Sequence, residues 1–136
     1  MNINGDLFIN NTSTSLNDLA NLREKVLWTN LNPSADFSGQ KINLSSTDYD
    51  YYMVIFATST SLAVWCNTGL IPKGKRCELS TCYSENNQFW IRYRGTSAVA
   101  DGSITFNNAV TMESKGNTSS NANYYCIPVY IIGYKK

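Results

Sequence analysis

Residues 51–57 read Tyr-Tyr-Met-Val-Ile-Phe-Ala, and this stretch decides the fold class. A short and almost unbroken apolar run, rich in aromatic and β-branched residues, is typical of a strand that is buried on both faces. Turn-forming residues come directly before it, at Asp48-Tyr49-Asp50. The run therefore predicts a central strand, with the rest of a sheet built on either side of it.

Further strands are predicted before and after this run. Apolar or alternating patterns mark them at 37–44, 61–66, 76–83, 89–94, 103–112 and 124–134. Polar turns separate them, among them Glu85-Asn86-Asn87 and the loop 115–123. Pro128 predicts an edge strand or a bulge, because proline has no N–H to donate to a neighbour. Seven or eight short strands predict an all-β fold, an antiparallel β-sandwich of jelly-roll-like type.

The N-terminal part has a different pattern. Residues 1–14 predict a short β-ribbon that turns at Asn4-Gly5-Asp6, and residues 15–26 predict a short helix capped by Ser15. We therefore divide the chain into a connector or oligomerisation segment, 1–27, and a β-sandwich domain, 28–136.

A narrow apolar stripe on the predicted helix makes it a candidate for oligomerisation. Leu19, Leu22 and Val26 follow the 3–4 spacing of one helix face. The stripe either packs on the following domain or forms a parallel bundle with copies of itself. A helix of this length and a ten-residue ribbon bury little alone, so we expect a homotrimer.

Composition excludes several classes of partner. The 136 residues include 11 Lys and Arg and 10 Asp and Glu, a net charge of +1, so a nucleic-acid partner is not expected. Most of the polarity comes instead from 17 Asn, 15 Ser and 12 Thr. The sequence contains no run of 18 apolar residues, so we do not expect membrane insertion. No basic and apolar leader follows Met1, so we do not expect export by the general secretory route.

The sequence offers little for catalysis or metal binding. Histidine is absent, which excludes a Ser-His-Asp triad and a histidine-ligated metal. The cysteines at 66, 77, 82 and 126 have a poor spacing for zinc and are expected to be small apolar residues in strands. A glycosidase needs two carboxylates that face each other across a cleft, and no such pair is visible in the sequence. We therefore expect no enzyme activity, no metal and no cofactor.

The stretch 89–94 carries the candidate ligand-binding residues. Its alternation puts Phe89, Ile91 and Tyr93 on one face and Trp90, Arg92 and Arg94 on the other. If the first three residues point to the core, then Trp90, Arg92 and Arg94 point outward. An outward tryptophan beside two arginines either stacks on a sugar or covers a neighbouring subunit.

The other aromatic residues are less specific. Trp28 and Trp65 lie in apolar settings and are predicted to belong to the core. The tyrosines near the starts of strands supply amphipathic contact area that serves interfaces and glycan binding equally; they are at 49, 51, 52, 124 and 125.

Both ends of the predicted domain resemble a known family. Val-Leu-Trp-Thr-Asn-Leu-Asn-Pro-Ser-Ala-Asp-Phe-Ser-Gly-Gln-Lys-Ile-Asn-Leu (26–44) and the following Asp48-Tyr49-Asp50 resemble the opening of a β-rich domain at the ends of bacteriophage tail and fibre proteins. Ile104-Thr105-Phe106 and the closing strand, residues 123–135, resemble the end of the same domain. The leading Asn-Ile-Asn-Gly-Asp-Leu-Phe-Ile-Asn is similar to the connectors that precede such domains.

The resemblance implies a virion structural protein, a tail or capsid fibre made in the host bacterial cytoplasm. Its implied partners are two further copies of the chain, other virion proteins and a glycan of the host cell surface. A carbohydrate-binding module of a secreted or modular bacterial protein is the alternative. A polysaccharide-degrading spike is a third interpretation, and it requires the carboxylate cleft that the sequence does not reveal.

Overall fold

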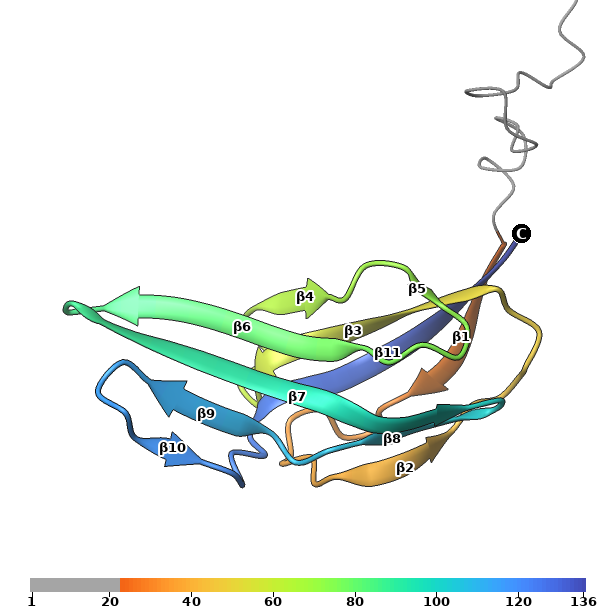
Figure 1. Ribbon diagram of the computed structural model, residues 1–136. Coiled ribbons are helices and arrows are strands. Elements are labelled where there is room, and N and C mark those ends of the chain that lie inside the picture. The colour runs from red at the N-terminus through yellow and green to blue at the C-terminus, as the bar shows by residue number, and fades with distance from the viewer. Residues whose placement is uncertain (1–22) are drawn as a thin grey trace, which may run out of the picture.

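The computed structural model describes residues 23–136, which form two antiparallel sheets (Figure 1). The first sheet has the order β1-β11-β3-β4, with β5 also paired to β3. Its strands are β1 (Arg23–Thr29), β11 (Tyr125–Lys135), β3 (Tyr51–Ser59), β4 (Trp65–Asn67) and β5 (Ile71–Pro72). The second sheet has the order β10-β9-β7-β8-β2, with β6 also paired to β7. Its strands are β10 (Thr118–Ser119), β9 (Val110–Glu113), β7 (Gln88–Ala100), β8 (Ser103–Phe106), β2 (Gln40–Asn43) and β6 (Glu78–Glu85).

One core lies between the two sheets. The first sheet contributes buried side chains from β1, β3 and β11, and the second sheet contributes buried side chains from β2, β6 and β8. The largest of them are Leu27, Tyr52, Val54, Phe56, Ile127, Ile131, Ile42, Leu79, Ile104 and Phe106. Two antiparallel sheets without a helix in the described residues confirm the prediction of an all-β fold.

The run that predicted a central strand is β3. It pairs with β11 along one edge and with β4 and β5 along the other. Tyr52, Val54 and Phe56 are buried in the core, and the alternate residues of the strand are half-buried. The prediction is therefore confirmed.

Pro128 lies at a bulge in β11, where the register with β3 shifts between Pro128 and Tyr130. The prediction of a bulge is confirmed, but the alternative of an edge strand is wrong, because β11 lies between β1 and β3. At the bulge, two backbone carbonyls of β11 accept hydrogen bonds from Asn30. Its backbone N–H donates to the Val129 carbonyl at 2.8 Å, and its side-chain amide donates to the Pro128 carbonyl at 2.8 Å.

Strands β6 and β7 form a hairpin that reaches past the shared core (Figure 1). Its two-residue turn is Asn86-Asn87, with φ angles of 52° and 59°, as a type I′ turn requires. This turn sets the pairing of Glu85 with Gln88 and, in step, of Tyr83 with Trp90. The opposite edge of β7 pairs with β9 over residues 90–93. Within the described chain, β6 is paired along one edge only.

The helix predicted over 15–26 is wrong where the structure describes it. Arg23–Thr29 is strand β1, and Val26 pairs with Ile132 of β11. Local 3–4 spacing favoured a helix, but pairing with a strand more than 100 residues later decides the conformation of this segment. The rest of that helix and the ribbon at 1–14 lie outside the described residues, as do Leu19 and Leu22. No helix in the described residues has the length and hydropathy needed to span a bilayer.

The two tryptophans predicted for the core differ. Trp28 packs on the core against Phe37, with ring centroids 6.0 Å apart. Trp65 is 47% exposed, so the prediction is wrong for this residue. It lies on β4, the last strand of its sheet, and its indole N–H donates to the Leu62 carbonyl at 2.9 Å.

We predict that Gly133→Ala destabilises the domain through Leu27. A Cβ at position 133 would lie 2.8 Å from Cδ1 of Leu27, a buried residue of β1. The substitution should lower the free energy of unfolding by about 1–3 kcal/mol, and Leu27→Ala alone should lower it by about 2–5 kcal/mol. In the double variant the shortened side chain at position 27 leaves space for the added methyl group. The loss of unfolding free energy measured by urea denaturation should therefore be smaller for the double variant than the sum of the losses for the two single variants. Additive effects would contradict the packing of β1 on β11.

Candidate functional site

Strand β7 has the opposite orientation to the one predicted. Phe89, Ile91 and Tyr93 are 47%, 37% and 37% exposed, whereas Arg94 is fully buried. The prediction that the first three residues belong to the core, with Trp90, Arg92 and Arg94 pointing outward, is therefore wrong. The physical reason is that the inward face of β7 meets backbone carbonyls and the Tyr125 ring of the opposite sheet, which accept a guanidinium as apolar side chains would not.

Arg94 joins three parts of the chain. Its Nε donates to the Cys126 carbonyl at 2.8 Å, its Nη1 to the Asn107 carbonyl at 2.7 Å and its Nη2 to the Tyr125 carbonyl at 3.1 Å. Burial lowers the pKa of Arg94 to about 10, so the guanidinium stays charged at neutral pH. Arg94 is thus committed to backbone carbonyls, which fix the start of β11 against β7.

Arg92, two residues earlier, lies among tyrosine rings. Its guanidinium carbon is 3.7 Å from the ring centroid of Tyr125 and 4.4 Å from that of Tyr83. Its Nη2 donates to the Tyr83 hydroxyl at 2.7 Å, and its buried Nε has no hydrogen-bond partner in the described residues. These contacts hold a half-buried cation in one position.

Trp90 continues the same face toward the hairpin turn. Its ring stacks on Tyr83, its cross-strand partner, with centroids 4.7 Å apart and planes 13° from parallel. Tyr124 and Tyr125 lie close together at the start of β11, with ring centroids 4.3 Å apart. Two aromatic pairs therefore flank Arg92.

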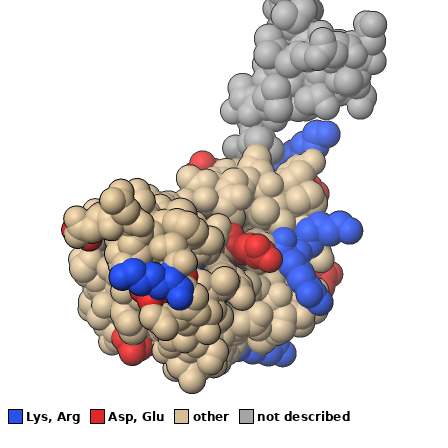
Figure 2. All heavy atoms as spheres, turned by 60° about the vertical axis from the view of Figure 1, so that its left-hand side comes forward, with Lys and Arg blue, Asp and Glu red and all other residues tan. Residues whose placement is uncertain are grey.

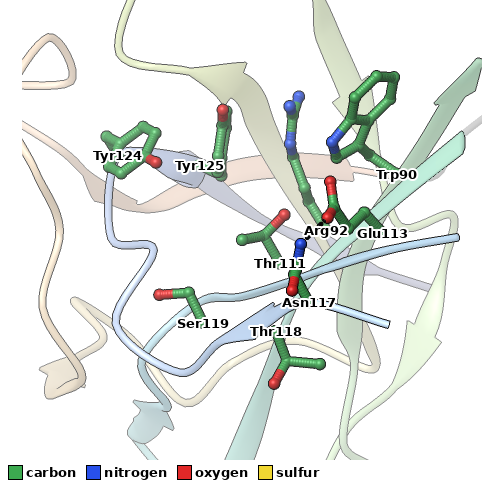
Figure 3. A pocket seen from close by; sticks show the side chains of 9 residues that line it. All are labelled: Trp90, Arg92, Thr111, Glu113, Asn117, Thr118, Ser119, Tyr124 and Tyr125. Atoms are coloured by element: carbon green, nitrogen blue, oxygen red, sulfur yellow. Dashed lines mark hydrogen bonds between the residues drawn. The ribbon is translucent and has the colours of Figure 1, made fainter. Parts of the chain in front are cut away.

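These residues line a hollow of about 320 Å³. Figure 3 shows Arg92 between Tyr125 and Trp90, and Glu113 beside Asn117. The lining comes from β7, β9, β10 with the turn before it, and the start of β11: Trp90, Arg92, Thr111, Glu113, Asn117, Thr118, Ser119, Tyr124 and Tyr125. We call it the aromatic hollow.

The Glu113 carboxylate is fixed at the floor of the aromatic hollow. It accepts from the Gln88 side-chain amide at 2.6 Å and from the Asn117 side-chain amide. Cross-strand pairing brings it there, because Glu113 lies opposite Trp90 and Thr111 opposite Arg92 on β9. Three aromatic rings, a carboxylate, an amide, hydroxyls and a guanidinium converge on one cavity, as in sites that bind polar small molecules.

A second hollow of about 540 Å³ lies on the other side of Arg92 and Tyr83. It runs between β6 and the β3–β4 edge of the first sheet and is lined by Thr58, Val64, Cys66, Ser80, Thr81, Cys82, Tyr83 and Arg92. We call it the edge hollow. Since Arg92 lines both, a ligand of either hollow meets the same guanidinium.

The cysteines differ in their access to solvent. Cys77 and Cys126 are buried, and burial raises the pKa of each thiol to about 11, so both stay protonated at neutral pH. Cys66 is half-buried and Cys82 is exposed. All four are free thiols, and residues 23–136 contain no cluster of three Cys, Asp or Glu side chains suited to a metal ion.

Sequence reasoning singled out part of the aromatic hollow and missed the rest. Trp90 and Arg92 were candidate ligand-binding residues, whereas Tyr124 and Tyr125 were assigned no specific role; the structure brings all four together. Arg94 is separated from them in the core, and Val26 lies on β1 with 53% of its surface exposed. Tyr83 could have been found, because a two-residue turn at 86–87 places residue 83 opposite residue 90. Nothing in the sequence around Glu113 indicates that it lies beside Trp90 in this site.

Comparison with known proteins found no match to a family model, to a curated protein or to a solved structure. The interpretation of the site therefore rests on its geometry and on the chemistry of its side chains.

We predict that Arg94 is required for stability. Arg94→Met removes the donor to three carbonyls in two backbone segments, so the free energy of unfolding should fall by at least about 3 kcal/mol. Arg94→Lys keeps the charge but not the planar fork of donors, and it should recover part of the loss. The exposed Arg76→Met is the control, and urea denaturation is the measurement. An Arg94→Met variant as stable as this control would contradict the assignment.

Proposed function

We propose that the chain is a component of a bacteriophage tail or capsid fibre that binds a glycan of the host cell surface, and that its two-sheet domain is a jelly-roll-like β-sandwich. The observation that carries the binding function is the aromatic hollow. The fibre assignment is supported by the resemblance of residues 26–44, 48–50, 104–106 and 123–135 to the terminal domains of fibre proteins.

The lining of the aromatic hollow suits a sugar ring. A pyranose carries C–H groups that stack on an aromatic face, and hydroxyl groups that pair with carboxylates and amides. Trp90 and Tyr124 offer rings toward the two ends of the hollow, and Glu113 with Asn117 offers an acceptor and a donor between them. Tyr124 is 45% exposed, so its ring is available to a ligand.

The charge distribution is compatible with a glycan that needs no extended basic surface. Figure 2 shows a face with scattered charged side chains and large neutral areas between them. A net charge of +1 gives no long-range attraction for a polyanion such as nucleic acid. Recognition then depends on short-range stacking and hydrogen bonding inside the hollow.

The same strand supports self-association on its other face. Phe89, Ile91, Tyr93 and Met112, the cross-strand neighbour of Ile91, form an apolar stripe on the outer face of the second sheet. Their exposed fractions leave on the order of 300 Å² of apolar surface. A stable interface buries about 800 Å² per partner. The area of this outer stripe is therefore large enough to form the apolar centre of such an interface. We include a homotrimer in the proposal, with the outer stripe covered by a second copy.

A carbohydrate-binding module of a modular bacterial protein is the second candidate. The aromatic hollow would serve it equally well. Association distinguishes the two, because the fibre proposal requires a homotrimer and a carbohydrate-binding module works as a single copy.

We predict that Trp90→Ala and Tyr124→Ala each weaken binding to host cells or to their cell-surface polysaccharide at least about tenfold, as truncation of an anchoring aromatic residue does. The measurement is a binding titration of labelled protein on cells and on a glycan array. Leu31→Ala is the control, because it removes an apolar side chain that is 95% exposed and lies outside both hollows and the outer stripe.

Thermal unfolding of each variant separates loss of binding from loss of fold. Tyr124→Ala is the safer of the two, since Tyr124 is exposed and Trp90 also stacks on Tyr83. If Tyr124→Ala and Leu31→Ala bind alike, or if no glycan binds the intact protein, the aromatic hollow is not the recognition site.

We also predict that the intact chain is a homotrimer and that Ile91→Lys combined with Met112→Lys shifts it toward monomers. Two ammonium groups inside an apolar interface cannot be solvated, so association should weaken by more than about a hundredfold. Light scattering gives the molar mass. Leu31→Lys, at a loop position that is 95% exposed, is the control.

A truncated chain that begins at residue 23 tests the contribution of the N-terminal segment. The cut leaves β1 intact, because β1 begins at Arg23. We expect weaker assembly and an unchanged unfolding transition of the two-sheet domain. A monomeric intact chain at micromolar concentration would refute the trimer.

A further inference from the structure

The aromatic hollow contains a cation without a counter-ion. The ion pairs in the described residues are Lys73–Asp101 at 3.1 Å and Lys135–Asp48 at 2.9 Å, and neither involves Arg92. Glu113 lines the same hollow but is bonded to Gln88 and Asn117. Arg92 therefore brings a positive charge to the hollow that no carboxylate of residues 23–136 within ion-pair distance neutralises.

The donors of Arg92 are only partly used. Nη2 donates to the Tyr83 hydroxyl, and Nε has no partner in the described part of the chain. The tyrosine rings offset part of the cost of holding the cation out of water. Ring contacts do not accept N–H groups in the guanidinium plane. Nε is buried, so within the described residues Nη1 is the donor that is neither hydrogen-bonded nor buried and is left for a ligand of the hollows that Arg92 lines.

Immobilisation makes this cation suited to a specific ligand group. A free arginine side chain loses rotamer freedom when it binds an anion, but the rings of Tyr83 and Tyr125 already hold Arg92 in place. A planar guanidinium matches the geometry of carboxylate and phosphate oxygens better than an ammonium group does.

We propose that the aromatic hollow selects sugars that carry an anionic substituent, a carboxylate or a phosphate, and that Arg92 binds this substituent. The proposal rests on the glycan-binding function and names the chemical class of the glycan. Glu113 orients the sugar: like charges repel, so the anionic group lies toward Arg92 and the hydroxyl groups lie toward Glu113 and Asn117. Because Arg92 also lines the edge hollow, a longer chain continues past Tyr83 into that space.

The test compares sugars that differ only in charge. Glucose, glucuronate and glucose 6-phosphate, and the corresponding galactose series, are titrated into the intact protein while the NMR signals of the Arg92 Nε–H and the Trp90 indole N–H are followed. We expect the anionic sugars to move both signals and to bind at least about tenfold more tightly than the neutral ones. The carboxylate and phosphate series show which of the two anions is preferred.

Variants and salt then isolate the charge. Arg92→Gln should abolish the preference for anionic over neutral sugars, and Arg92→Lys should retain part of that preference. Glu113→Gln should strengthen the binding of anionic sugars several-fold, because it removes a nearby negative charge. Raising the ionic strength from about 0.01 M to about 0.15 M should weaken only the anionic ligands. Thermal unfolding checks that each variant is folded.

The outcomes separate this inference from the proposed function. Equal binding of neutral and anionic sugars, or an anion preference that survives Arg92→Gln in a folded protein, overturns the role of Arg92 and leaves glycan binding intact. If no sugar in either series moves the Arg92 or Trp90 signals, the anion selectivity is also overturned, and binding to cells and to the glycan array decides separately whether the protein binds glycans.

Discussion

The arrangement of the two sheets depends on the Arg94 guanidinium. It is the largest fully buried side chain of the described structure, and it donates to carbonyls on the loop after β8 and at the start of β11. A cation in this position fixes the inward face of β7. Once Arg94 points inward, Arg92 and Trp90 must follow, because a strand alternates its side chains. The aromatic hollow is therefore a consequence of the same interaction that joins the sheets.

Local signals predicted much of the fold and about half of the site. The apolar run at 51–57, the Asn86-Asn87 turn and the bulge at Pro128 all depend on a few neighbouring residues, and they were predicted correctly. The orientation of β7 was not, since alternation separates two faces but does not say which is buried, and the carbonyls that accept from Arg94 lie 13 and about 30 residues away. β1 was mistaken for a helix for the same reason: its partner is the last strand of the chain. Glu113 lies beside Trp90 because β9 pairs with β7, a pairing between strands that β8 separates along the chain.

In the proposed function, recognition and association use opposite faces of β7. Trp90 and Arg92 line cavities on the inner face, whereas Phe89, Ile91 and Tyr93 form the outer stripe. The hairpin of β6 and β7 reaches past the core, so its inner face is only partly covered by the first sheet (Figure 1). A copy seated on the outer stripe would leave the aromatic hollow open, which is what a fibre with several recognition sites requires.

The single-sided pairing of β6 has a consequence for solubility. A strand with one free edge is a template for cross-chain aggregation, and the middle of β6, Ser80-Thr81-Cys82-Tyr83, carries no charge to prevent it. Glutamates stand at both ends instead, at Glu78 and Glu85. Two β6 strands in full antiparallel overlap would place Glu78 of one copy against Glu85 of the other, so like charges meet at both ends of the ladder. A shift of two residues separates the carboxylates but shortens the overlap. The edge thus resists pairing with itself while it stays open to a chain of different charge.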